Sequence, residues 1–162
     1  MKVAIVMGSD SDLPVMQKTA QMLEKFGIEH EITITSAHRS PHRTRSIVKE
    51  YHDKGVKIII AGAGAAAHLA GVIAAETILP VIGVPINSSP LQGFDSLFST
   101  VQMPGGIPVA TMAVGSAGAK NAAVFAAQIL AVSDKAISAR LQDFKKEMEL
   151  EVEKKAENIK QI

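Results

Sequence analysis

The sequence contains no cysteine and no tryptophan, and Tyr51 is its only tyrosine. Without cysteine the chain has no disulfide bonds and no thiolate ligands for a metal ion. The scarcity of aromatic side chains argues against surfaces that stack nucleic-acid bases or a flavin ring. No apolar run approaches the roughly 18 residues that cross a bilayer, and residues 1–7 are too few for a signal peptide. We therefore expect a soluble, cytoplasmic protein.

The chain also lacks an excess of charge of either sign. Its 17 Lys and Arg residues against 16 Asp and Glu residues give a net charge of +1, which provides no field for recruiting nucleic acid or an acidic membrane. No carboxylate pair stands at helical spacing with a histidine, so no metal site is expected. At 162 residues the chain is long enough to form one domain with a full hydrophobic core.

What the sequence does have is an alternation of short apolar runs and helical patterns. Strands are predicted at residues 3–7, 32–35, 56–61, 81–84 and 109–113. Helices are predicted from Leu13 to a C-cap at Gly27, and at residues 41–54, 66–77, 95–102 and 117–131. Strands that alternate with helices form βαβ units with parallel strands. We therefore predict an α/β fold, a three-layer αβα sandwich around a flavodoxin-like or Rossmann-like sheet of about five strands.

The C-terminal residues differ from the rest of the chain in being rich in charge. Residues 135–162 carry apolar side chains at steps of three and four, which predicts a long amphipathic helix. We divide the chain into an α/β domain over residues 1–132 and this helix over residues 133–162. Two arrangements remain open, because the helix can cover its own sheet or pack on another subunit of a homo-oligomer.

Four turns follow predicted strands and would meet at the carboxyl edge of a parallel sheet, where ligands bind. The first is Gly8-Ser9-Asp10-Ser11-Asp12. The hydroxyls of Ser9 and Ser11, with the free N–H groups of the following helix, can hold an anion, and Asp12 can accept from ribose hydroxyls. The turn lacks the further glycines of the dinucleotide-binding fingerprint. A plain Ser/Asp helix cap is the alternative interpretation.

The second turn is Ser36-Ala37-His38-Arg39-Ser40-Pro41. Arg39 offers a guanidinium group that can bind a phosphate through two N–H groups, and Ser36 offers a further donor. His38 is the candidate for proton transfer near neutral pH. Ser40 and Pro41 are typical of the N-cap and the first residue of a helix. The alternative is that His38 and Arg39 are solvated loop residues.

The third turn, at residues 62–71, has almost no large side chains, so its backbone can lie against a planar ligand or a small carboxylate. Gly64 and His68 are its candidate site residues. Tight packing between helix and sheet is the alternative, with His68 at a helix start or in the core. Loops rich in Gly and Pro at residues 87–93 and 103–108 could cover a pocket.

Together, the motifs at residues 8–12, 36–41, 62–68 and 102–111 resemble those of the N5-carboxyaminoimidazole ribonucleotide mutases, the bacterial class I members of the phosphoribosylaminoimidazole carboxylase family. The resemblance implies a Rossmann-like three-layer sandwich assembled as a homo-octamer. It also implies an isomerase of de novo purine biosynthesis. The implied reaction moves a carboxyl group from the 5-amino nitrogen of an aminoimidazole ribonucleotide to ring carbon 4, without a cofactor or a metal.

The resemblance also implies a role for each candidate residue. The carbamate releases carbon dioxide, which stays trapped while the ring carbon attacks it, and His38 is the general acid/base that moves the proton between nitrogen and carbon. Arg39, Ser9 and Ser11 match phosphate-binding positions, and Asp12 matches a ribose-binding position. The remaining matches line the pocket: Ser36, Gly64 and His68.

Two differences from related sequences bear on this interpretation. The chain has Ala65 where the family usually has a second glycine, and we expect the added methyl group to tighten the pocket floor. It has Arg39 where the class II enzymes, which carboxylate the ring directly with carbon dioxide, usually carry lysine, and this favours the mutase. The alternatives are a class II carboxylase and a non-catalytic nucleotide-binding module.

Overall fold

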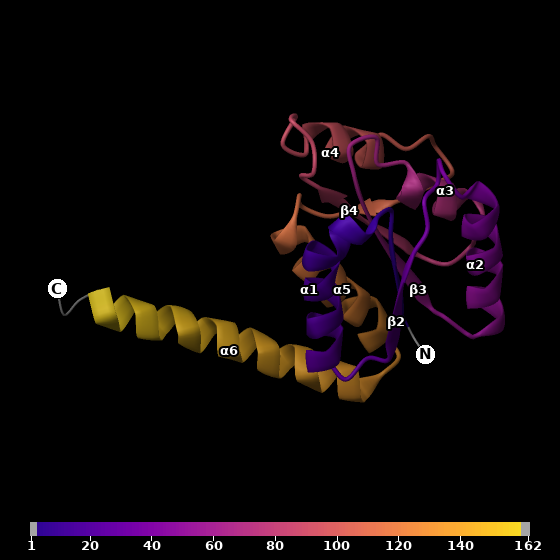
Figure 1. The fold of residues 1–162 in the computed structure, drawn as a ribbon. Coiled ribbons are helices and arrows are strands. Elements are labelled where there is room, and N and C mark those ends of the chain that lie inside the picture. Colours follow the sequence, from indigo (N-terminus) through magenta and orange to yellow (C-terminus); the bar gives the residue numbers. More distant parts are fainter. Residues whose placement is uncertain (1–2, 160–162) are drawn as a thin grey trace.

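The computed structural model describes residues 3–159, which form a parallel sheet between two layers of helices (Figure 1). The sheet has five strands in the order β2-β1-β3-β4-β5, and every neighbouring pair is parallel. This confirms the predicted α/β sandwich. The strands are β1 (Val3–Met7), β2 (His30–Ile34), β3 (Ile58–Gly64), β4 (Val81–Ile86) and β5 (Ala110–Thr111).

Helices connect the strands in the alternation that the sequence predicts. A short 3-10 turn, η1 (Asp10–Asp12), leads from β1 into the first helix. The helices are α1 (Leu13–Lys25), α2 (Pro41–Asp53), α3 (Leu69–Ala75), α4 (Phe94–Val101), α5 (Ser116–Ala131) and α6 (Lys135–Ile159). Because strand order reverses between β1 and β3, the connections after these two strands diverge and leave room for a ligand at the carboxyl edge of the sheet.

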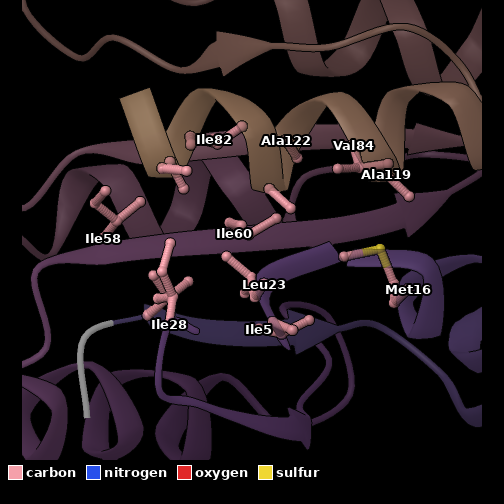
Figure 2. Packing of buried hydrophobic residues seen from close by; sticks show 14 of the residues in the cluster. Ile5, Met16, Leu23, Ile28, Ile58, Ile60, Ile82, Val84, Ala119 and Ala122 are labelled. Carbon is pink, nitrogen blue, oxygen red and sulfur yellow. The ribbon is translucent and has the colours of Figure 1, made fainter. Parts of the chain in front are cut away.

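Apolar side chains are buried on both faces of the sheet, which explains why the strands are continuous apolar runs. On one face Ile5 and Ile60 pack against α1 and α5, and α5 contributes mainly alanines (Figure 2). Small alanine side chains allow this helix to lie close to the strands. On the other face Val6 and Ile59 pack against α2 and α3. The two layers fix the strand ends that carry the candidate turns.

Most elements differ from their predicted bounds by one or two residues, and three of the differences have a clear structural basis. Strand β3 runs to Gly64 instead of residue 61, because its ladder with β4 continues through the pair Gly64 and Ile86. Helix α3 begins at Leu69 instead of residue 66, and the Ala67 N–H bonds to the Ser99 hydroxyl outside the helix. Strand β5 has two paired residues instead of five.

The C-terminal helix α6 packs on the domain through its first half. Ile137 is buried, and the Phe144 ring meets Phe26 edge to face at a centroid distance of 5.4 Å. Arg140 donates from Nη1 to the carbonyl oxygen of Phe26 at 2.7 Å. Farther along, α6 extends away from the sheet, with Val152 exposed (Figure 1). The predicted end of this helix, at residues 160–162, lies outside the described residues.

Candidate active site

A cavity of about 270 Å³ lies at the carboxyl edge of the sheet, where the connections after β1, β2, β3 and β4 meet. All eight candidate residues line it: Ser9, Ser11, Asp12, Ser36, His38, Arg39, Gly64 and His68. Ala37, Ala63, Ala66, Leu69 and Ser88 complete most of the remaining surface. Turns that are far apart in the sequence therefore meet as the predicted topology requires.

The first turn is closed by hydrogen bonds from its own side chains. Ser9 is the N-cap of η1, and its hydroxyl accepts from the Ser11 N–H at 3.4 Å. The Asp12 carboxylate accepts in return from the Ser9 N–H at 3.1 Å, which forms a capping box. The helix-cap interpretation and the binding-site interpretation are therefore compatible, because these residues cap the turn and also line the cavity.

Asp12 is almost fully buried. Only 4% of its surface is exposed, and this burial raises the pKa of its carboxyl group, although the N–H groups of Ser9 and Gly8 oppose the rise. One carboxylate oxygen is already held by the Ser9 N–H. Asp12 thus has a structural role in addition to its place in the cavity wall.

Asp10 uses the donors of the same turn. Its carboxylate accepts from the Ser9 hydroxyl at 3.0 Å and from the Ser11 N–H at 3.1 Å. These two hydrogen bonds, the Ser9 hydroxyl first, hold the pKa of Asp10 below its usual value, and the charge of Arg39 adds to the effect. The Asp10 carboxylate therefore occupies two of the donors that the sequence predicts for binding an anionic ligand.

The second turn is held by a ring of short backbone and hydroxyl contacts. The Ser40 N–H bonds to the Ser36 carbonyl oxygen at 2.9 Å, and the Arg39 N–H bonds to the Ser36 hydroxyl at 3.1 Å. Ser40 occupies the predicted N-cap position of α2, but its side chain makes no capping bond to that helix. The turn is ordered by its own contacts, and it presents His38 and Arg39 side by side on the cavity wall.

The two cavity histidines are in direct contact. His38 Nε2 lies 2.7 Å from His68 Nδ1, and the rings meet edge to face at 81°. His68 stands at the N-cap position of α3, as the helix-start interpretation predicts, but its ring turns to His38 and makes no cap bond. A hydrogen bond at this distance places one proton between the two nitrogens, so one ring donates while the other accepts.

Arg39 extends from the second turn to the first. Its Nη2 donates to the Gly8 carbonyl oxygen at 3.4 Å, and the side chain remains exposed. The guanidinium group is therefore next to Ser9 and Ser11 in the lining of the same cavity. A cation, two hydroxyls and backbone N–H groups on adjacent turns form a set of donors suited to a phosphate.

Apart from His68, the third turn contributes backbone and methyl groups to the cavity. A Cβ atom at Gly64 would overlap the Ser88 hydroxyl, so glycine is needed for this close approach. Ala65 has φ of 51°, in the left-handed region that favours glycine. Its side chain is exposed and is not part of the cavity lining, so the expectation that its methyl group tightens the pocket floor is wrong. The methyl groups at the cavity belong to Ala63 and Ala66.

Sequence reasoning missed the individual roles of Ser88 and Asp10. Ser88 lies in the loop at residues 87–93 that was expected to cover a pocket, and it is the residue of that loop that lines the cavity. Its signal was the Gly/Pro-rich loop after a strand. Asp10 was part of the first motif, but nothing in the sequence indicated which N–H groups its carboxylate would bind.

Within residues 3–159, no group of three His, Cys, Asp or Glu side chains lies close enough to hold a metal ion. Over the same residues, no helix combines the length and the apolar character needed to cross a membrane.

The cavity lies at the switch point of a doubly wound sheet, where α/β proteins bind small-molecule ligands. Its histidine pair and its hydrogen-bond donors suited to a phosphate define a candidate enzyme site for a phosphorylated small molecule. The family model described as AIR carboxylase matches residues 2–151. The chain belongs to the AIR carboxylase family.

Curated relatives and solved structures agree with this assignment. A protein of Thermotoga maritima named N5-carboxyaminoimidazole ribonucleotide mutase is 53% identical over 161 residues, covering 99% of this chain and 93% of the relative. An Escherichia coli K12 protein of the same name is 53% identical over 145 residues, covering 90% of this chain and 86% of the relative. The crystal structure of Treponema denticola PurE matches with a TM-score of 0.83 at 33% identity, covering 99% of this chain and 97% of that one.

Proposed function

We propose that this chain is an isomerase of purine biosynthesis that converts N5-carboxyaminoimidazole ribonucleotide to 4-carboxy-5-aminoimidazole ribonucleotide. Relatives that are 53% identical over nearly the whole chain are named for this mutase activity. At the site, the observation that carries the proposal is the hydrogen-bonded pair of His38 and His68 in a cavity that also holds Arg39. Phosphate binding alone gives no reason for that pair.

The reaction requires one proton to move and to be returned. Cleavage of the carbamate N–C bond releases carbon dioxide, and the amine nitrogen takes up a proton. Ring carbon 4 then attacks the carbon dioxide, and once the new C–C bond has formed, this carbon loses its proton. A single group that first donates and then accepts completes the cycle, and we assign this role to His38.

His68 supports His38 in this role. The contact between Nε2 of His38 and Nδ1 of His68 holds one proton. The nitrogen that carries this proton is the donor and the other nitrogen is the acceptor, so the tautomer of one ring sets the tautomer of the other. The pair can therefore keep the His38 ring in one orientation while its proton content changes. His68 is placed here as a pocket residue that orients the catalytic histidine.

The nucleotide would be anchored at its other end by the first two turns. Arg39 with the hydroxyls of Ser9 and Ser11 would bind the phosphate, and Asp12 would accept from the ribose. Ser36 and Gly64 line the same cavity. At about 270 Å³ the cavity lies just below the roughly 300–1,000 Å³ range of ligand pockets, which suits a ligand no larger than one mononucleotide.

The third turn would supply room for the released carbon dioxide. Ala63, Gly64 and Ala66 present little side-chain volume at the cavity, and they offer no acidic group that would repel a carboxylate. Holding carbon dioxide beside its acceptor replaces a bimolecular encounter, and effective molarities on the order of 10⁵ M are reached by well-oriented partners. No cofactor and no metal enters the proposed cycle.

We also propose a homo-octamer in the cytoplasm, in which the outer part of α6 packs on another subunit. Leu150, Val152 and Ile159 are apolar and exposed on that part of the helix, which supports a partner there. The division of the chain into a catalytic domain at residues 1–132 and a C-terminal helix at residues 133–162 follows the same reasoning. Light scattering on the purified protein gives the subunit number directly, and a monomer would contradict the proposal.

Turnover on two substrates tests the function. One substrate is the N5-carboxylated ribonucleotide, and the other is the uncarboxylated ribonucleotide supplied with bicarbonate. The proposal predicts the 4-carboxylated product mainly from the first. Product mainly from the second would make the chain a direct carboxylase, and binding without product from either would leave a nucleotide-binding module.

A further inference from the structure

Ser40 stands at the N-cap of α2, yet its hydroxyl does not cap the helix. The Ser40 hydroxyl instead accepts from the Ser36 N–H at 3.0 Å and donates to the Ser36 carbonyl oxygen at 3.1 Å. An N-cap serine ordinarily bonds forward, to an N–H of the first helical turn. Here the hydroxyl bonds backward, across the turn that carries His38 and Arg39. This departure indicates that the side chain serves the turn more than the helix.

Two buried threonines continue the network from Ser40. Thr35 follows β2 and is 2% exposed, while Thr44 lies in the first turn of α2 and is 0% exposed. Thr35 Oγ1 lies 2.9 Å from Thr44 Oγ1 and 3.3 Å from Ser40 Oγ. Thr44 Oγ1 also donates to the Ser40 carbonyl oxygen at 3.3 Å. The strand end, the turn and the helix start are thus linked through three hydroxyls.

Each hydroxyl of this network has only one hydrogen to donate. Ser40 donates to the Ser36 carbonyl oxygen, and Thr44 donates to the Ser40 carbonyl oxygen. Thr35 can then donate its one hydrogen to Thr44 at 2.9 Å or to Ser40 at 3.3 Å, but not to both. Every hydroxyl hydrogen has an acceptor in this arrangement. Removal of one member leaves a buried polar group without its partner, where little water can replace it.

We propose that Thr35, Ser40 and Thr44 are positioning residues. They hold the second turn, residues 36–41, in its working geometry, and we call it the catalytic turn because it carries His38. The inference rests on the proposed function, in which this turn carries His38 as the acid/base and Arg39 as the phosphate ligand. None of the three residues lines the cavity, so each acts through the turn and not on the substrate. A displacement on the order of 1 Å at a catalytic group can cost a hundredfold in rate, so the precision of this turn matters.

Thr44 offers a clean test, because the chain contains a matched control. Thr44→Val keeps the shape of the side chain and removes its hydroxyl. Thr19 is also helical, 0% exposed, and donates its hydroxyl to a backbone carbonyl, that of Ala119, at 2.8 Å. Because Thr19 lies in α1 and bonds to α5, Thr19→Val removes an equivalent buried hydrogen bond outside the catalytic turn. Thr44→Ser retains the hydroxyl and serves as the rescue variant.

Two readouts are taken from the full chain well below the unfolding temperature of every variant. Turnover of the N5-carboxylated ribonucleotide gives kcat and KM, and hydrogen exchange of the peptide covering residues 35–40 reports the order of the turn. We expect Thr44→Val to lower kcat/KM roughly tenfold and to speed exchange in this peptide. Thr19→Val should leave both at wild-type values even where it lowers stability, and Thr44→Ser should restore both.

Equal effects of Thr44→Val and Thr19→Val, or wild-type exchange and turnover in Thr44→Val, would overturn the inference. Failure of the proposed function has a different signature, because wild-type protein would then give no product. Hydrogen exchange still decides the inference in that case. Faster exchange confined to Thr44→Val would uphold the role in ordering the turn, and unchanged exchange would refute it.

Discussion

The two walls of the cavity are built in opposite ways. One wall, which we call the polar wall, comes from the first two turns. It presents polar side chains that are held by hydrogen bonds, such as those around Ser9 and Ser36. The other wall, which we call the bare wall, comes from the end of β3 and the residues just after it. Before His68, it presents backbone and methyl groups at Ala63, Gly64 and Ala66. The proposed reaction needs both, because a charged nucleotide must be fixed while a small neutral molecule is given room. The difference separates groups that act from groups that make space.

The walls also differ in how their conformations are stabilised. The polar wall is stabilised by contacts, including the network around Ser40. A strained residue lies next to the bare wall, since Ala65 adopts φ of 51° although it is not a glycine. A left-handed conformation costs a non-glycine residue roughly 1–2 kcal/mol. Substitutions on the polar wall should therefore change function most, and those on the bare wall should change stability.

The largest effect is expected at the acid/base group of the polar wall. His38→Asn should lower turnover by at least about a hundredfold, because proton transfer by a positioned group contributes roughly 10²–10⁴. Nucleotide binding should change by less than about tenfold, or ~1.4 kcal/mol, because the phosphate ligands remain. The control is His42→Asn, an exposed histidine on α2 outside the cavity. Normal turnover in the His38 variant would remove it from the mechanism.

Arg39→Ala should weaken binding instead of chemistry. The loss of a charge-assisted contact to phosphate is expected to raise the dissociation constant of the nucleotide roughly tenfold to a hundredfold. The effect should vanish for the corresponding nucleoside, which has no phosphate, and titration calorimetry with both ligands measures it. Arg45→Ala, in an exposed ion pair with Glu76 at 3.0 Å, is the control. An equal loss for nucleoside and nucleotide would contradict the phosphate assignment.

A smaller effect of opposite sign is expected at Asp10. Its carboxylate uses the Ser9 hydroxyl and the Ser11 N–H, which a substrate phosphate would also need. The pKa of Asp10 is lowered, so the carboxylate stays charged across the neutral range and competes there. Asp10→Asn should therefore lower KM about threefold with little change in kcat. Asp53→Asn, at the exposed end of α2, is the control, and a raised KM in the Asp10 variant would show that the carboxylate helps binding.

The smallest functional change is expected at Ala65, which lies next to the bare wall and outside the cavity. Ala65→Gly should relieve the left-handed strain and raise the free energy of unfolding by about 0.5–1 kcal/mol, after the greater freedom of glycine in the unfolded chain is subtracted. Turnover should stay at the wild-type level because Ala65 does not line the cavity. Chemical denaturation measures the gain. A loss of stability would mean that this conformation is not strained in the folded protein.

Much of the polar wall could be predicted from the sequence for two reasons. Histidine, arginine and serine side chains each have a characteristic chemistry, and the carboxyl ends of parallel strands lie at the same edge of the sheet. His38, Arg39 and Ser9 needed only a place at a strand end to become candidates. The partner of a hydroxyl was not predictable, since Ser40 has the sequence of a helix cap and the contacts of a turn brace. That choice depends on where Thr35 and Thr44 are buried, which only the packed structure specifies.

The bare wall was harder to predict, because small residues are compatible with strand, turn and helix. Gly62 and Gly64 were expected in a turn and lie in β3, since their ladder with β4 decides their conformation. The position of Ala65 outside the cavity depends on its backbone angle, which residue type does not indicate. The amphipathic pattern of α6 correctly predicted a helix, but not where it leaves the domain.

The most direct test of the central claim follows the carboxyl carbon. The N5-carboxylated ribonucleotide is prepared with carbon-13 in its carbamate and converted by the wild-type protein in excess unlabelled bicarbonate, with carbonic anhydrase to equilibrate free carbon dioxide. If the bare wall retains carbon dioxide beside the ring while His38 moves the proton, the product keeps the label. Product carrying mainly unlabelled carbon would show that the carboxyl group comes from solution, and would contradict the account.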